Sequence, residues 1–247
     1  MIFIFTRIDG MKNERICQLN KQFEINNQNW LEDSNPNAHH FAIKKEKWKI
    51  MISAPHSVNH IREWKLLKAD LLTWWLSLYL SERFNIPCIY SISHLVWDPN
   101  YDDIENCEYK QRLLEYVKEN NIKFLIDLHW CWSERNFAIE LWTWWDWHPN
   151  LQGNEKLLNV ILNSLKDNLS SYLLHTWREI TVNTIFPASH KNTISNFIFT
   201  KAHIPTLQLE INYELRDTLN VDKISKLITA LEKLIEDINS YHTSFGY

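Results

Sequence analysis

Histidine and carboxylate side chains gather where three apolar runs of this 247-residue chain end. The candidates are His56, His60 and Glu63 just after the run at 49–54, His129 at the end of the run at 124–129, and Glu210 inside the run at 206–212. Zinc in a catalytic site binds about three protein ligands from His and carboxylate side chains, with one position open for water. A single His or Glu in such a place is more often a cap or a surface group, but together these residues are typical of a metal site.

Two further patterns favour a site at these strand ends. Asp127 and His129 are two residues apart, so they share one face of a strand, and Asp127 could orient a metal-bound imidazole. The alternative for Asp127 is a strand-end hydrogen bond. Gln208, Glu210 and Asn212 share a face in the same way. A polar face on so apolar a strand indicates a cleft more than a core.

The elements that must position these residues alternate between β-like and helix-like segments from about residue 45. This alternation is typical of an α/β architecture with a mostly parallel sheet. In such open sheets, functional groups collect beyond the carboxyl ends of the strands. We expect strands at 49–54, 88–93, 124–129, 137–141, 179–183 and 206–212. We expect helices at 66–84, 105–121, 152–171, 189–203 and 220–241.

The chain is expected to be one domain, 1–247, with an N-terminal hairpin and loop at 1–44 and a core at 45–247. The net charge of -4 and the lack of a long basic run argue against a nucleic-acid partner. No stretch approaches 18 apolar residues and the start lacks a signal-peptide pattern, so no membrane partner is expected. The four cysteines lack CxxC spacing, and we expect reduced thiols in a cytoplasmic protein. Nothing in the sequence indicates an oligomeric state.

Five motifs resemble, in the same order, those of the N-formylglutamate amidohydrolase family: ISAPHSVNHIRE, WDPNYD, LIDLHW, VNTIFPASHKNTIS and IPTLQLEIN. They extend from about residue 49 to 215, and the core of the match is PHS, DLH and QLEIN. That family is similar in fold to the zinc carboxypeptidases and aspartoacylases. The resemblance implies a three-layer α/β/α sandwich with a mixed, mostly parallel sheet, a single Zn²⁺ as cofactor, and hydrolysis of an amide next to an acidic group.

Carried over residue by residue, the resemblance implies that His56, Glu63 and His129 hold the zinc. His60 is a rival ligand, because HIRE reproduces the HxxE spacing of the carboxypeptidase-like relatives. The same resemblance makes Glu210 the catalytic base, which takes a proton from water and returns it to the leaving amine. The residues at 45–247 would then form a zinc-hydrolase core.

One motif departs from the family pattern. Relatives commonly carry Asp-x-Asn-Arg where this chain reads DPNY, so Tyr101 stands in place of the arginine expected for the substrate carboxylate. Arg62 or Arg135 could replace it, because a guanidinium fork suits a carboxylate. The alternative for each is a solvated surface arginine. The resemblance also assigns Asn100 and Asn183 to substrate binding.

The expected function is a zinc-dependent amidohydrolase that cleaves the amide of an N-acyl acidic amino acid, as in N-formylglutamate. Its partner would be a small-molecule acidic amide, the substrate. A γ-glutamyl or peptide amide is the alternative substrate for the same fold. A degenerate relative that has lost activity is a second alternative, for which Tyr101 is the hint. A third, from another class, is a non-catalytic Trp-rich carbohydrate-binding protein whose exposed indoles stack on sugars.

Tryptophan and glycine occur in unusual proportions. An average chain has about 7% Gly, or about 17 in this length, whereas this one has 3 Gly and 13 Trp, with four of the Trp in WTWWDW at 142–147. In the family that this chain resembles, glycine typically occupies the positions of Trp64, Trp130 and this stretch. We expect many of these tryptophans to be glycines in the living protein, encoded by a reassigned stop codon. The expected positions are 64, 74, 75, 130, 132, 142, 144, 145 and 147.

Overall fold

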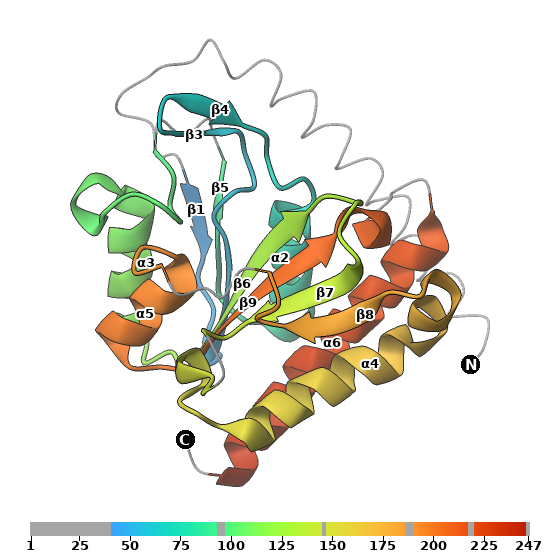
Figure 1. Ribbon diagram of the computed structural model, residues 1–247. Helices are drawn as coiled ribbons and strands as arrows, with labels where there is room; N and C mark the ends of the chain where they lie inside the picture. The colour runs from blue at the N-terminus through green and yellow to red at the C-terminus, as the bar shows by residue number, and fades with distance from the viewer. Residues whose placement is uncertain (1–40, 93–96, 145–146, 186–189, 217–219, 246–247) are drawn as a thin grey trace.

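The computed structural model describes residues 41–92, 97–144, 147–185, 190–216 and 220–245 (Figure 1). The strands of its main sheet are β1 (Phe41–Lys44), β2 (Ile50–Ala54), β5 (Cys88–Ser91), β6 (Phe124–Cys131), β7 (Phe137–Trp142), β8 (Glu179–Val182) and β9 (Thr206–Asn212). They lie in the order β1-β5-β2-β6-β9-β7-β8. β1 is antiparallel to β5, and β7 is antiparallel to β9, while the other four pairs are parallel. This confirms the mixed, mostly parallel sheet.

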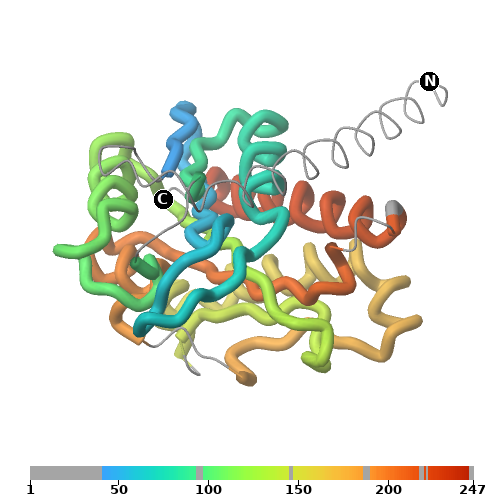
Figure 2. Tube along the Cα trace, turned by 90° about the horizontal axis from the view of Figure 1, so that it is seen from above, coloured from blue at the N-terminus to red at the C-terminus, as the bar shows by residue number. Residues whose placement is uncertain are grey.

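Helices cover both faces of the sheet and complete the predicted three layers. Two of them, α3 and α5, pack on one face, and α2, α4 and α6 pack on the other (Figure 1). Figure 2, turned by 90°, again has α4 and α6 side by side, in agreement with their extensive contact. The helices are α2 (Thr73–Phe84), α3 (Glu108–Glu119), α4 (Glu155–Thr176), α5 (Ile194–Ala202) and α6 (Val221–Phe245), with short 3-10 turns at η1 (Ile104–Asn106), η2 (Pro149–Leu151) and η3 (Tyr213–Arg216).

The strand side chains explain why both faces are covered. In β2, Ile50 and Ile52 belong to the core under α2, α4 and α6, while Met51 between them belongs to the core under α3 and α5. In β6, Leu125 and Ile126 divide in the same way between the two cores. A parallel strand with apolar side chains on both faces needs a helical layer on each side. Only the ends of the strands are left for polar side chains.

One predicted helix begins later than the sequence indicated. The prediction was 66–84, whereas α2 begins at Thr73. Residues 60–67 instead form a two-stranded ribbon, whose turn holds Glu63 and Trp64 at φ 49° and 64°. Leu67 is still extended in this ribbon, and Leu72 has a left-handed φ of 75°, which interrupts a right-handed helix, so the helix starts only at Thr73. The strands of the ribbon are β3 (His60–Arg62) and β4 (Lys65–Leu67).

Most of the predicted N-terminal hairpin and loop, residues 1–40, lies outside the described residues. The remaining part, β1, is an edge strand that pairs with β5, so residues 41–44 belong to the main sheet. Among the described residues, no helix is both long and apolar enough to cross a membrane.

Candidate metal centre and pocket

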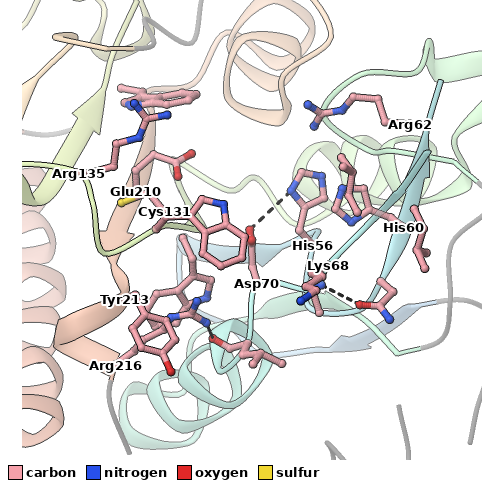
Figure 3. A pocket seen from close by; sticks show the side chains of 18 of the residues that line it. His56, His60, Arg62, Lys68, Asp70, Cys131, Arg135, Glu210, Tyr213 and Arg216 are labelled. Carbon is pink, nitrogen blue, oxygen red and sulfur yellow. Dashed lines mark hydrogen bonds and ion pairs between the residues drawn. The ribbon is translucent and has the colours of Figure 1, made fainter. Parts of the chain in front are cut away.

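Three adjacent parallel strands, β2, β6 and β9, end at one edge of the sheet and bring predicted residues together. His56 follows β2, His129 lies near the end of β6, and Glu210 of β9 is paired with His129 in the register of the two strands. A pocket of about 1120 Å³ opens at this edge, and both His56 and Glu210 line it (Figure 3). The topology therefore gathers residues that are up to 154 positions apart in the sequence.

Asp70 joins His56 and His129 in a cluster of potential metal ligands. Its Oδ2 lies 3.6 Å from Nδ1 of His56 and 3.2 Å from Nδ1 of His129. Zinc bound at about 2.0–2.1 Å in tetrahedral geometry separates its ligand atoms by about 3.3 Å, so these spacings fit one zinc ion. Both rings are buried. Because His56 and Asp70 line the pocket, a fourth coordination position would face it.

Each histidine of the cluster also contacts a second carboxylate, through its other ring nitrogen, Nε2. Nε2 of His56 lies 2.8 Å from Oδ1 of Asp98, and Nε2 of His129 lies 3.0 Å from Oδ2 of Asp127. Both carboxylates are fully buried. A carboxylate that accepts the Nε2–H fixes the tautomer whose Nδ1 can bind a metal. Asp127 thus lies where an orienting carboxylate is needed, and Asp98 has the matching position for His56.

The cluster favours positive charge. Burial lowers the pKa of His56, but Asp98 and Asp70 outweigh it and raise that pKa above its ordinary value. For His129, burial is again outweighed, by Asp127 and Asp70, and the pKa is raised well above its ordinary value. Burial acts to raise the pKa of Asp70, yet hydrogen bonds from His129 and His56 hold it well below its usual range. The site is therefore suited to bind a cation, either as protons or as a metal ion.

His60, the rival ligand, stacks on His56 instead of facing the same point. The ring centroids are 4.0 Å apart and the ring planes differ by 5°. His56, His60 and Asp98 also offer ligand atoms within 4.8 Å of one another, but the lone pairs of an imidazole lie in its plane, so two parallel, stacked rings are poorly oriented to bind one ion. Burial and the charge of His56 lower the pKa of His60 to about 3. His60 packs as a neutral ring beside the cluster, with Nε2 3.5 Å from Oδ2 of Asp98.

Glu63, the expected third ligand, lies away from the cluster. It is exposed in the turn between β3 and β4, and its Oε1 accepts a hydrogen bond of 2.5 Å from the Tyr101 hydroxyl. The ribbon carries Glu63 outward and then brings the chain back, where the Asp70 N–H donates to the carbonyl of His56 at 2.7 Å. Asp70, and not Glu63, is therefore the carboxylate that meets the two histidines.

Glu210 is buried beside the cluster and has an unusual pKa. Its side chain lies near Cys131 and Arg135 in Figure 3, where it and His56 flank Asp70. Burial raises the pKa of Glu210 to about 8, although the charge of His129 opposes this. Its Oε1 accepts a hydrogen bond of 3.0 Å from the Gln208 amide. A carboxyl group that titrates near neutral pH can accept a proton and release it again, as a general base must.

Both predicted arginines line the pocket, but Arg62 is already paired. Its Nε lies 2.5 Å from Oδ2 of the buried Asp98, and its guanidinium lies over the Tyr101 ring, 5.6 Å from the centroid. The charge of Arg62 thus helps to hold the carboxylate that orients His56. Arg135 lines the pocket on the side of Glu210 (Figure 3).

The two predicted asparagines are not among the residues that line the pocket. The amide nitrogen of Asn100 lies 3.0 Å from Nε2 of His129, so Asn100 contacts the cluster from behind. Asn183 contacts Thr143 through both amide atoms, at 2.8 and 3.0 Å. Asn100 therefore lies next to His129, and Asn183 contacts the loop after β7.

Comparisons with solved structures identify the fold. An N-formylglutamate amidohydrolase from Ralstonia eutropha superimposes with a TM-score of 0.54 at 11% identity, over 81% of this chain and 97% of that chain. A bacteriophage poly-gamma-glutamate hydrolase gives 0.51 at 14% identity, over 86% and 95%. A metallo-carboxypeptidase from Burkholderia cenocepacia gives 0.53 at 11% identity, over 80% of this chain and 58% of that chain. The chain has the fold of N-formylglutamate amidohydrolase. No protein-family model and no curated protein matches its sequence.

Within this amidohydrolase-like fold, sequence reasoning missed three residues of the pocket region. Asp70 lay inside the predicted helix 66–84, although an acidic residue just before the true helix start was an available signal. Asp98 was read only as part of the WDPN motif, and nothing in the sequence pairs it with His56. Arg216, whose guanidinium lines the pocket, follows the QLEIN motif without any pattern that marks it.

Proposed function

We propose that this protein is a zinc-dependent amidohydrolase that cleaves the amide of an N-acyl acidic amino acid. The observation that carries the proposal is the cluster of His56, Asp70 and His129, whose spacings fit one zinc ion, at a pocket that also contains Glu210. The fold shared with N-formylglutamate amidohydrolase and a metallo-carboxypeptidase supports it.

In the proposed reaction, His56 and His129 present Nδ1 and Asp70 presents Oδ2 to the zinc, while Asp98 and Asp127 keep the imidazoles in the required tautomer. Zinc bound there would polarise an amide carbonyl and make a water molecule more acidic. The Glu210 carboxylate accepts the proton of the attacking water and then donates it to the leaving amine. Burial of Glu210 favours its protonated form, so the proton is held without a large cost until the amine accepts it.

An acidic substrate fits the charges of the pocket. Arg135 lines it on the side of Glu210, and a guanidinium prefers a carboxylate partner. N-formylglutamate and other N-acyl acidic amino acids are the substrates that we propose first. A γ-glutamyl amide is the second candidate, which the likeness to a bacteriophage poly-gamma-glutamate hydrolase favours.

A direct test is hydrolysis by the zinc-loaded protein of N-formylglutamate, N-acetylglutamate and γ-glutamylglutamate, with release of the amine as the readout. We expect turnover of at least one of these amides, its loss after chelation, and its return when zinc is added. Glu210→Gln serves as the matched control, because it should keep the zinc and lose turnover. Turnover that survives both chelation and Glu210→Gln would refute the proposal.

We also propose that some of the tryptophans are glycines in the natural protein. Trp64, Trp144 and Trp177 have φ of 64°, 63° and 56°, in the left-handed region that glycine adopts without strain. Two of them, Trp64 and Trp177, expose 98% and 89% of their surface, so packing does not explain an indole there. Trp75, in contrast, lies in a helix and is 5% exposed, so its backbone and packing give no reason for glycine.

The coding DNA tests the recoding proposal. If a stop codon is read as glycine, the codons at 64, 144 and 177 should be the reassigned stop codon. Mass spectrometry of the natural protein should then find glycine in the peptides that span these positions. UGG at all 13 tryptophan positions, or tryptophan in those peptides, would overturn it.

A further inference from the structure

Arg216 contacts aromatic rings and a carbonyl at the pocket, and it forms no ion pair among the described residues. It ends η3, just after β9, and its guanidinium lines the pocket (Figure 3). The guanidinium carbon lies 4.7 Å from the ring centroid of Trp130 and 4.6 Å from that of Tyr213. One NH1 proton is donated to the carbonyl of Leu71 at 3.1 Å. The contacts with the Tyr213 ring and the Leu71 carbonyl do not involve the indole of Trp130.

The hydrogen-bonding capacity of Arg216 is mostly unused. Among the residues that the structure describes, no carboxylate forms an ion pair with the guanidinium within 4.0 Å, although the charge of Asp70 acts on it, and its buried Nε has no hydrogen-bond partner. Arginine has five N–H donors in a planar fork, and the one described bond accounts for one of them. An arginine with buried donors and no anion at hydrogen-bonding distance among the described residues is costly, so an anion bound in the pocket would complete its hydrogen bonds.

The other arginines near this edge of the sheet have partners of their own. Arg62 is paired with Asp98, and Arg178 is paired with Glu214 at 2.9 Å. Arg216 differs from both because its neighbours are aromatic faces and one carbonyl. Stacking on aromatic rings orients a guanidinium while leaving its in-plane donors free.

Arg216 also lies next to the proposed zinc ligands. Leu71, which accepts its hydrogen bond, directly follows Asp70 in the chain, and Glu210 lies on the same β9–η3 segment as Arg216. A substrate whose scissile amide lies between Asp70 and Glu210 would therefore bring its other end within reach of the guanidinium.

We propose that Arg216 binds a carboxylate of the substrate and thereby sets the preference for acidic amides. This inference rests on the proposed amidohydrolase function and specifies which residue recognises the carboxylate of the substrate. The carboxylate supplies an anion at hydrogen-bonding distance from Arg216, which lines the pocket. The missing arginine at Tyr101 would then be replaced by a residue from a different part of the chain.

The test compares N-acetylglutamate with its two monoamides, in which either the α- or the γ-carboxylate is neutral. Hydrogen bonds to a charged group are worth about 10- to 100-fold in affinity, so the protein should prefer the diacid by that factor over the monoamide that lacks the recognised carboxylate. Arg216→Gln should abolish this preference, mainly through KM, and should leave hydrolysis of that monoamide nearly unchanged. Arg216→Lys, which keeps the charge but not the fork, should retain part of it.

Arg83→Gln is the matched control, since Arg83 is paired with Glu232 and is not among the residues that line the pocket. It should keep the preference for the diacid. Arg135→Gln tests the other arginine that lines the pocket, and it should keep the preference over the monoamide that Arg216 distinguishes. Loss of the preference in Arg135→Gln and not in Arg216→Gln would overturn the assignment, as would an equal loss for all three compounds in Arg216→Gln and Arg216→Lys.

Binding separates this inference from the proposed function. Calorimetry with N-acetylglutamate and its monoamides, on Glu210→Gln with and without Arg216→Gln, needs no turnover. If no amide is hydrolysed but the diacid binds 10- to 100-fold more tightly than one monoamide only when Arg216 is present, the proposed reaction fails and the role of Arg216 stands. If hydrolysis occurs but binding does not depend on Arg216, the role of Arg216 fails alone.

Discussion

Two sides of the pocket differ in how their charges are compensated. On the histidine side, both ring nitrogens of His56 and of His129 lie within 3.6 Å of a carboxylate. On the arginine side, Arg216 contacts two aromatic faces and one carbonyl, and among the described residues no carboxylate lies within 4.0 Å of it, although the charge of Asp70 acts on it. The charges of the histidine side are compensated once a cation binds among its carboxylates. In our proposal an anionic ligand completes the arginine side, so the proposed substrate carries both an amide and a carboxylate.

The largest effect is expected from removing the shared carboxylate of the histidine side. Asp70→Ala should lose stoichiometric zinc and all hydrolysis, because Asp70 Oδ2 is the atom that both imidazoles approach. Glu63→Ala is the control and should keep about one zinc per chain, since Glu63 is exposed and bonded to Tyr101. Metal analysis after gel filtration measures both. Loss of zinc from Glu63→Ala would instead support the ligand set expected from the sequence, which is His56, Glu63 and His129.

The next effect concerns the proton carrier that lies between the two sides. Glu210→Gln removes the base but keeps the shape, so kcat should fall by about 100- to 10,000-fold, while the zinc content stays the same. Steady-state kinetics and metal analysis on one preparation measure the two quantities. A variant with unchanged kcat would mean that another group accepts the proton.

Smaller changes should follow from the carboxylates behind the histidines. Asp98→Asn and Asp127→Asn should each weaken zinc binding by about 10- to 100-fold, because the amide no longer fixes the tautomer of His56 or His129. Competition with a chromogenic chelator gives the zinc affinity. Asn183→Ala, away from the pocket lining, is the control and should bind zinc normally.

The pH dependence of the zinc-free protein tests the charges of the histidine side. The folded-state pKa values of His56 and His129 are raised, so their contribution to stability is complete below pH 6.5 and is lost as the pH rises through the raised values. Glu210, with its pKa raised to about 8, acts with the same sign, because the folded state holds its proton at a pH where the unfolded state has released it. Tm without zinc should therefore fall between pH 6.5 and pH 8.

Zinc should oppose this loss, because it replaces the Nδ1 protons as the cation of the cluster. The increase in Tm caused by zinc should grow with pH over the same range. A zinc-free Tm that is flat or rises from pH 6.5 to pH 8 would contradict the charge states assigned to the two histidines.

The smallest effect is expected outside the pocket, at the strained tryptophans. Trp64→Gly and Trp177→Gly should each raise the free energy of unfolding by about 1 kcal/mol, because strain at φ near 60° is relieved and an exposed indole is lost. Trp75→Gly should instead lower it by about 3–5 kcal/mol through loss of core packing. Chemical denaturation of the three variants gives these differences. Destabilisation by Trp64→Gly would remove the physical basis for glycine there.

The two sides also differ in how far the sequence predicts them. His56, His129, Asp127 and Glu210 belong to strands or follow them directly, and the expected strands agree with the observed ones within a few residues. Their convergence follows from parallel strands that end at one edge. Asp70 could not be foreseen in the same way, because it lay inside the predicted helix 66–84, whereas the observed helix α2 begins only at Thr73.

The arginine side depends on contacts that no local pattern encodes. Arg216 donates a hydrogen bond to the carbonyl of Leu71, which is 145 positions away, and this contact does not involve the side chain of residue 130. Such contacts are set by how the loops pack at the sheet edge, so the sequence suggested Arg62 and Arg135 instead. Sequence periodicity finds residues that a strand or helix positions, and it misses residues that are positioned by loops.

The most direct test of the central claim is a crystal structure of the zinc-loaded protein with anomalous data collected at the zinc edge. We predict one strong peak per chain, within about 2.0–2.2 Å of Nδ1 of His56, Nδ1 of His129 and Oδ2 of Asp70. A peak coordinated by His60 or Glu63 in place of Asp70, or no peak in protein that hydrolyses its substrate, would contradict the account.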